Sequence, residues 1–113
     1  MKTYCLALDL VNDPALINQY EQYHKKIWPE ITASIKDSGI NEMRIYRVAN
    51  RLMMIIQANE DFSFEEKAKE DESNPHVKKW EALMWDYQQS IPGSKPGEKW
   101  RLMELIFDLK VNG

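Results

Sequence analysis

The sequence contains a single cysteine, Cys5, so it can form neither an internal disulfide nor a cysteine pair that binds zinc. A lone thiol favours a reducing compartment, and we expect a cytoplasmic protein. The first ten residues, MKTYCLALDL, hold only a short apolar run before Asp9. That run is too short for a membrane-spanning helix and does not have the form of a signal peptide, so we expect no membrane association.

Glycine and histidine are also scarce, and the chain has no excess of positive charge. The four glycines stand at positions 39, 93, 97 and 113, which leaves no glycine-rich loop for binding phosphate. The two histidines, His24 and His76, show none of the spacings typical of metal sites, so we expect neither a metal nor a cofactor. The net charge of −3 and the pI of about 5.4 argue against binding to nucleic acid or to an anionic membrane.

What the chain does contain is enough apolar sequence for one domain. Its 113 residues are 43% hydrophobic and 29% charged, which is typical of a globular protein rather than a disordered one. Four Trp, five Tyr and three Phe are many for this length, and we expect some of them to line a binding surface. We therefore interpret residues 1–113 as a single domain.

Hydrophobic periodicity and helix-capping residues predict the order β-α-β-β-α-β. Strands are expected at residues 3–10, 40–48, 52–58 and 100–109. A first helix is expected over residues 13–38, with a kink at Pro29. The second helical region comes in two pieces: a short helix capped by Ser63 and Glu66, and a helix over residues 74–90.

This order is that of a ferredoxin-like α+β fold, in which four antiparallel strands carry the helices on one face. The third strand is nevertheless apolar on both faces, and the first strand is nearly so. A large exposed apolar sheet face is rare in a monomer. We therefore predict a homodimer whose two sheets pack face to face; the alternative is a monomer with an unusually apolar open face.

Tyr20 and His24 are the first residues that could carry chemistry. Their spacing of four places them side by side on the apolar helix face that looks toward the sheet. A histidine there could transfer protons near neutral pH, or it could be a core residue bonded to a backbone carbonyl. Trp80, on the apolar face of the later helix, could likewise bind the C–H face of a sugar ring or fill the core.

The segment from Tyr20 through His24 to Ile27-Trp28-Pro29-Glu30 has the pattern Y-x-x-x-H-x-x-I-W-P-E. On a β-α-β-β-α-β chain of this length, and together with Ile45-Tyr46 and Trp80, that pattern resembles the L-rhamnose mutarotase family. The resemblance covers nearly the whole chain. It implies a homodimeric α/β barrel that interconverts the α and β anomers of a 6-deoxy sugar, such as L-rhamnose or L-fucose.

The resemblance also implies roles for individual residues. His24 matches the family's proton donor, and Tyr20 and Trp80 match residues that bind the sugar. Glu81 stands where members active on L-rhamnose often carry a second tryptophan, and Met43 stands where they carry a tyrosine. Both positions are expected to touch the substrate, so these two departures bear on which 6-deoxy sugar the protein uses.

We therefore predict a mutarotase without metal or cofactor, in which His24 gives or takes a proton while the sugar ring opens and recloses. The second proton-transfer group is left open between Tyr20, bound water and Glu81. Two alternatives would use the same fold: a sugar-binding module without catalysis, and a haem protein or small-molecule oxygenase with His24 as an axial ligand.

Overall fold

The computed structural model describes residues 1–112, and these form one antiparallel sheet with helices packed against it. The strands are β1 (Lys2–Leu10), β2 (Ile40–Val48), β3 (Arg51–Ala58), β4 (Gln88–Gln89) and β5 (Arg101–Leu102). The helices are α1 (Pro14–Lys25), α2 (Pro29–Asp37), α3 (Phe64–Glu72), α4 (Pro75–Trp85) and α5 (Leu109–Asn112). None of these helices combines the length and the apolar character needed to cross a lipid bilayer.

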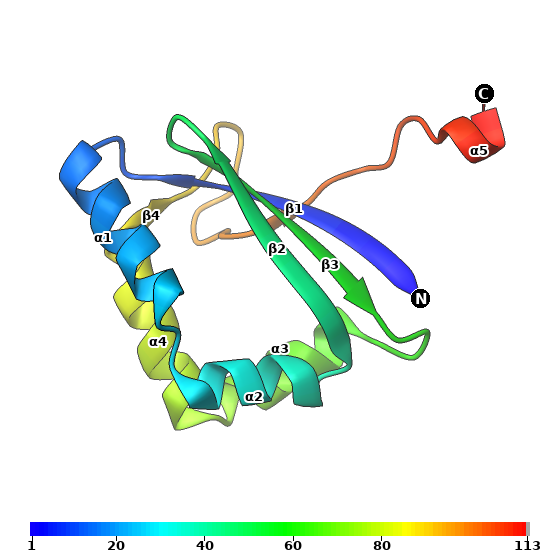
Figure 1. The fold of residues 1–113 in the computed structure, drawn as a ribbon, viewed down its shortest axis with the longest axis horizontal. Coiled ribbons are helices and arrows are strands. Elements are labelled where there is room, and N and C mark those ends of the chain that lie inside the picture. The colour runs from blue at the N-terminus through cyan, green and yellow to red at the C-terminus, as the bar shows by residue number, and fades with distance from the viewer. Residues whose placement is uncertain (113) are drawn as a thin grey trace.

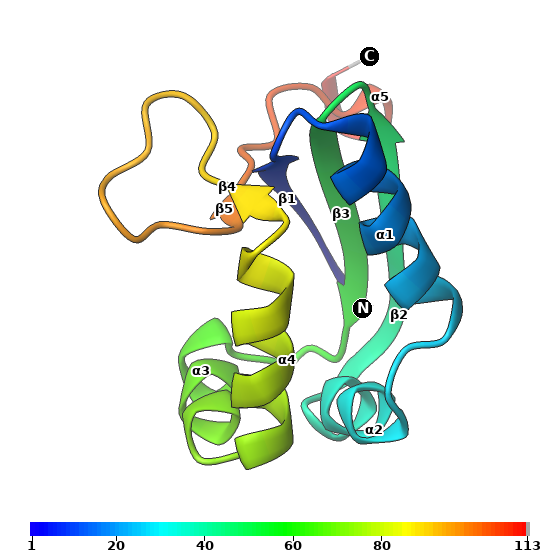
Figure 2. The same cartoon turned by 90° about the vertical axis from the view of Figure 1, so that its left-hand side faces the viewer.

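The sheet has the strand order of a ferredoxin-like fold. Its path is β2-β3-β1-β4, and the short β5 also pairs with β1. β1 and β3 pair in one continuous register from Lys2 opposite Ala58 to Asp9 opposite Arg51. Helices α1 to α4 gather on one side of the sheet (Figures 1 and 2). The predicted ferredoxin-like arrangement is therefore confirmed.

Pro29 breaks the first helical region instead of kinking it. The carboxylate of Asp13 caps α1 by accepting two backbone N–H bonds, as the sequence predicts, but α1 already ends at Lys25. Trp28 lies in the extended region, with φ −61° and ψ 135°, because the ring of a following proline disfavours helical backbone. The prediction of one kinked helix is wrong, and α2 runs across the end of α1 (Figure 1).

The second half of the chain departs from the prediction at two places. Asn74 caps α4 as expected, yet the helix ends at Trp85 rather than near residue 90, and residues 88–89 pair with β1 instead. The predicted last strand, 100–109, shrinks to the two residues of β5. The chain beyond it leaves the sheet (Figure 1), where Ile106 is 91% exposed and pairs with no strand of residues 1–112.

The core lies between the sheet and the helices. The most deeply buried large side chains come from alternate positions of β1 and β3, namely Leu8, Leu10, Leu52 and Ile56. Side chains on the other sheet face alternate with these, so α1 to α4 do not cover them. That open face includes Cys5, Tyr46, Val48, Met53 and Ile55, and Tyr46 and Val48 are 51% and 73% exposed.

Candidate functional site

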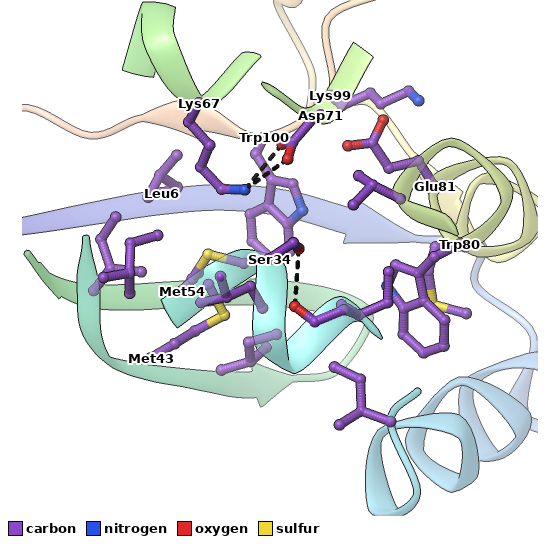
Figure 3. Close-up of a pocket in the computed structure, with 18 of the residues that line it drawn as sticks. Leu6, Ser34, Met43, Met54, Lys67, Asp71, Trp80, Glu81, Lys99 and Trp100 are labelled. Carbon is purple, nitrogen blue, oxygen red and sulfur yellow. Dashed lines mark hydrogen bonds and ion pairs between the residues drawn. The ribbon is translucent and has the colours of Figure 1, made fainter. Parts of the chain in front are cut away.

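A cavity of about 470 Å³ lies between the helix-facing side of the sheet and helices α1 to α4 (Figure 3). This volume falls within the range of roughly 300–1,000 Å³ that is usual for small-molecule sites. Most of its lining residues are apolar or aromatic, with isoleucine the most frequent, and a few polar groups lie among them. The structure brings all five candidate site residues to this cavity: Tyr20, His24, Met43, Trp80 and Glu81.

His24 comes from the last turn of α1 and has one ring nitrogen committed to the backbone. Its Nδ1 lies 2.8 Å from the carbonyl oxygen of Tyr20. Because a carbonyl oxygen can only accept, Nδ1 carries the proton in the neutral ring. No group within residues 1–112 hydrogen-bonds to Nε2, so its lone pair is available to a molecule in the cavity. His24 therefore makes the backbone contact expected of a core histidine through Nδ1, and its Nε2 remains able to accept a proton or a hydrogen bond.

The charge state of His24 follows from its surroundings. Burial lowers the pKa of the imidazole below its ordinary value of 6.5, and the hydrogen bond to the Tyr20 carbonyl opposes that effect only in part. The ring is therefore neutral at neutral pH. In that state Nε2 is a base that can accept a proton.

An aromatic cluster holds the imidazole in place. The ring centroid of His24 lies 4.4 Å from that of Tyr20 and 5.6 Å from that of Trp80, and Trp80 in turn meets Trp28 edge-on at 5.0 Å. Trp80 is only 8% exposed and belongs to the core cluster. Trp80 thus fills the core and also lines the cavity. It is a core residue, and it also stands where it could contact a bound sugar.

Tyr20 projects a hydroxyl that stays protonated. The side chain is 4% exposed, and its hydroxyl oxygen accepts a hydrogen bond of 3.2 Å from Nε2 of Gln88. Burial raises the pKa of the phenol to about 12, although the bond from Gln88 acts in the opposite direction. The phenol is therefore neutral, and its own hydrogen is not used in the bond that Gln88 donates. Gln88 was not predicted as a site residue, because the helix before it was expected to continue to residue 90, whereas Gln88 lies on β4.

Met43 and Glu81 occupy different walls. Met43 comes from β2, where it pairs with Ile56, and it is half-buried on the helix-facing side. Glu81 comes from α4 and lies at the edge of the cavity, with its side chain exposed. Partial loss of solvent raises the pKa of its carboxyl, and the negative charge of Asp71 adds to this, against the positive charge of Lys99.

Further polar residues of the cavity were not predicted. Lys67 and Asp71 of α3 form an ion pair there, and Lys99 and Trp100 reach the cavity from the segment before β5. The i, i+4 spacing of Lys67 and Asp71 is visible in the sequence. However, the only apolar residues of α3 are Phe64 and Ala68, which make a short and weak indication of the face that looks inward. Among residues 1–112, no three His, Cys, Asp or Glu side chains gather as a metal site.

Comparisons with known proteins identify the family to which this chain is similar. The model of a family described as L-rhamnose mutarotase matches residues 3–109. A protein of Xanthomonas campestris named L-fucose mutarotase is 46% identical over 111 residues, or 96% of this chain and 89% of that protein. An L-rhamnose mutarotase of Paraburkholderia phytofirmans is 28% identical over 80% of this chain and 79% of its own length. The crystal structure of an L-rhamnose mutarotase from Formosa agariphila has a TM-score of 0.71 at 23% identity, covering 96% of this chain and 99% of that one, which confirms the fold.

Proposed function

This chain belongs to the L-rhamnose mutarotase family, and from that premise we propose that it interconverts the α and β anomers of L-fucose. The activity class is the one predicted from the sequence, exchange of the anomers of a 6-deoxy sugar. L-fucose is favoured over L-rhamnose because the relative named for L-fucose is 46% identical, against 28% for one named for L-rhamnose. The two sugars differ only in configuration at C2 and C4, so a few contacts are enough to distinguish them.

The observation that carries the assignment of roles is the free Nε2 of His24 in the cavity wall. In the proposed reaction, neutral His24 takes the proton from the anomeric O1–H. The C1=O1 double bond forms while the bond between C1 and the ring oxygen O5 breaks. The Tyr20 hydroxyl donates its proton to O5, which becomes the hydroxyl of the open-chain aldehyde.

Reclosure runs through the same groups. Rotation about the C1–C2 bond turns the other face of the aldehyde toward O5. O5 then attacks C1 and returns its proton to Tyr20, while the imidazolium of His24 returns its proton to O1. No proton or electron is gained or lost over the cycle. A single acid–base group contributes about 10²- to 10⁴-fold in rate, which is sufficient for a reaction that also proceeds without catalysis.

The apolar walls help this chemistry. Removing water from around the polar groups strengthens the interactions between the sugar and His24 or Tyr20. Trp80 contributes an aromatic edge to the same wall and supports the imidazole from one side. We assign Met43 a contact with an apolar part of the sugar, because its side chain lies among other apolar groups of the cavity.

We also propose that the protein works as a homodimer. The sheet face opposite the helices carries apolar side chains along its strands and exposes Tyr46 and Val48. The segment after β5 exposes Leu105, Ile106 and Phe107 by 79%, 91% and 59%, away from the sheet (Figure 1). Apolar surface of this kind is removed from water when a second copy packs against it. Light scattering that gives the mass of a single chain would contradict the proposed dimer.

The proposed cellular location is the cytoplasm. The only cysteine, Cys5, is half-buried on the open face of β1 as a free thiol. Free thiols persist in reducing compartments, where internal disulfides are rare. Cell fractionation that recovers the native protein outside the cytoplasm would contradict this location.

The function is tested by following anomer exchange of L-fucose, L-rhamnose and D-glucose with NMR saturation transfer, after subtracting the exchange due to buffer. We expect the protein to accelerate L-fucose most and D-glucose least. Faster exchange of L-rhamnose would overturn the choice of sugar. Binding of L-fucose without acceleration would instead support the binding-module alternative.

The haem alternative is not favoured, because the relatives described above are named mutarotases. A Soret band in the absorption spectrum of the purified protein would support it.

A further inference from the structure

Helix α3 contributes a charged pair to the cavity that the proposed reaction does not use. Both carboxylate oxygens of Asp71 lie within hydrogen-bonding distance of Lys67 Nζ, at 2.9 and 3.1 Å. The two side chains lie on a different wall of the cavity from Trp80, and Glu81 reaches toward the same region from α4 (Figure 3). The cavity therefore has a second polar region besides the one around His24.

This pair is enclosed in a way that other charges of the same helix are not. The side chains of Lys67 and Asp71 are each 19% exposed, whereas Lys69 and Glu66, also on α3, are 74% and 69% exposed. An ion pair gains little stability from partial enclosure, because loss of solvent offsets most of the Coulombic attraction. Stabilisation of the fold alone is thus a weak reason for placing a lysine and an aspartate on the cavity wall.

The pair does suit a molecule with several hydroxyl groups. A lysine ammonium has three N–H donors, and a carboxylate accepts on both oxygens, so the mutual contact leaves donors and acceptors free side by side. Two adjacent hydroxyls of a sugar need that combination, since each hydroxyl both donates and accepts. Hydrogen bonds to charged groups are also stronger than those between neutral groups.

We propose that Lys67 and Asp71 bind the hydroxyls on C3 and C4 of the sugar and thereby select among 6-deoxy hexoses. The inference rests on the proposed function, which places the anomeric carbon, C1, at His24. C3 and C4 lie on the opposite side of the six-membered ring from the C1–O5 bond, so these hydroxyls face the second polar region. They are cis to each other in L-fucose and trans in L-rhamnose, so the pair distinguishes the two sugars at C4.

The test replaces each member of the pair and follows the kinetics of exchange. Asp71→Asn keeps the shape and removes the charge, and Lys67→Met keeps the apolar stem. We expect KM for L-fucose to rise about 10- to 100-fold in either variant, as for the loss of hydrogen bonds to a charged group. The value of kcat should change little, because ring opening takes place at C1. The matched control is Lys69→Met, which removes the same charge from the solvent-facing side of α3 and should leave both constants unchanged.

A second measurement needs no variant. Wild-type protein should show a KM at least tenfold higher for 4-deoxy-L-fucose than for L-fucose, and Asp71→Asn should abolish this difference. If Asp71→Asn does not fold, the wild-type ratio alone decides, and a ratio near one overturns the inference. Folded Asp71→Asn and Lys67→Met variants that keep the wild-type KM for L-fucose overturn the inference as well. In that case the proposed function still stands if the wild-type protein accelerates exchange of the L-fucose anomers. If the wild type exchanges no 6-deoxy sugar, the proposed function fails and this inference fails with it.

Discussion

Replacing His24 by glutamine should separate the chemistry of this residue from its packing. A glutamine amide can donate a hydrogen bond to the Tyr20 carbonyl, as Nδ1 does now at 2.8 Å, but it has no nitrogen that titrates near neutral pH. We expect kcat for L-fucose to fall by about 10²- to 10⁴-fold, the usual contribution of one acid–base group. KM should change much less, because the contacts that hold the rest of the sugar are kept.

The cost to stability can be bounded from the contacts of the ring. His24 packs on the rings of Tyr20 and Trp80, and aromatic pairs contribute about 0.5–1.5 kcal/mol each. Losing both lowers the free energy of unfolding by about 1–3 kcal/mol, against the roughly 5–15 kcal/mol of a typical domain. The variant therefore stays folded, and unfolding cannot account for a hundredfold loss of rate. Urea denaturation measures this difference directly.

The pH dependence gives the same experiment a second readout. The base is neutral His24, and burial lowers its pKa from 6.5. The wild-type rate should therefore be constant at neutral pH and fall on acidification, with a midpoint below 6.5. In the unfolded chain the pKa of His24 returns to its ordinary value of 6.5, which is higher than its pKa in the folded protein. At a pH between these two values the unfolded chain binds the proton and the folded chain does not. The free energy of unfolding therefore also decreases as the pH falls from 6.5 through the pKa of the folded protein. The glutamine variant should lack both effects.

His76 is the matched control, since it is the only other histidine of the chain. It is exposed at the start of α4 and is not among the residues that line the cavity. His76→Gln should keep the wild-type rate and pH profile. If His24→Gln exchanges anomers as fast as the wild type, or if His76→Gln loses as much activity, the assignment of the base is refuted.

Three further changes test other parts of the structure. Tyr20→Phe removes the acceptor of the buried Gln88 side chain, so the free energy of unfolding should fall by about 1–3 kcal/mol in urea, and exchange should slow because O5 loses its donor. Leu8→Ala empties a fully buried site, at a cost of about 2–5 kcal/mol in the same measurement. Ile106→Asp combined with Phe107→Asp should convert the proposed dimer to a monomer in light scattering, whereas an unchanged mass would exclude this segment from the interface.

Much of the fold was predictable because its signals are local. Asp13 and Asn74 each precede a proline and accept backbone N–H bonds at the start of a helix, so both helix starts could be located in the sequence. The spacing of Tyr20 and His24 places both on one helix face, and that face does line the cavity. The strand order follows from the sequence of elements together with the usual ferredoxin-like arrangement.

The features that were not predictable depend on partners distant in sequence. Residues 88–89 form a strand only because the edge of β1 is available to them. Residues 105–107 form an apolar run that is typical of a strand, but no second strand lies beside them within residues 1–112. Asp71 and Lys67 sit on a helix whose only apolar residues are Phe64 and Ala68, and the packing of α3 beside α4 turns their side chains toward the cavity. Local sequence patterns carry no information about such contacts.

The break at Pro29 connects the sequence pattern to the chemistry. If α1 continued without interruption, Ile31 would extend the same helix face as His24. Because the helix ends at Lys25 and restarts at Pro29, α2 turns across the end of α1, and its apolar face forms another wall of the cavity. Trp28, held in the extended conformation before the proline, packs on Trp80, which in turn packs on the imidazole. In the I-W-P-E stretch, Pro29 thus turns the backbone away from the direction of α1, and Trp28 packs against Trp80, the residue that contacts the His24 ring.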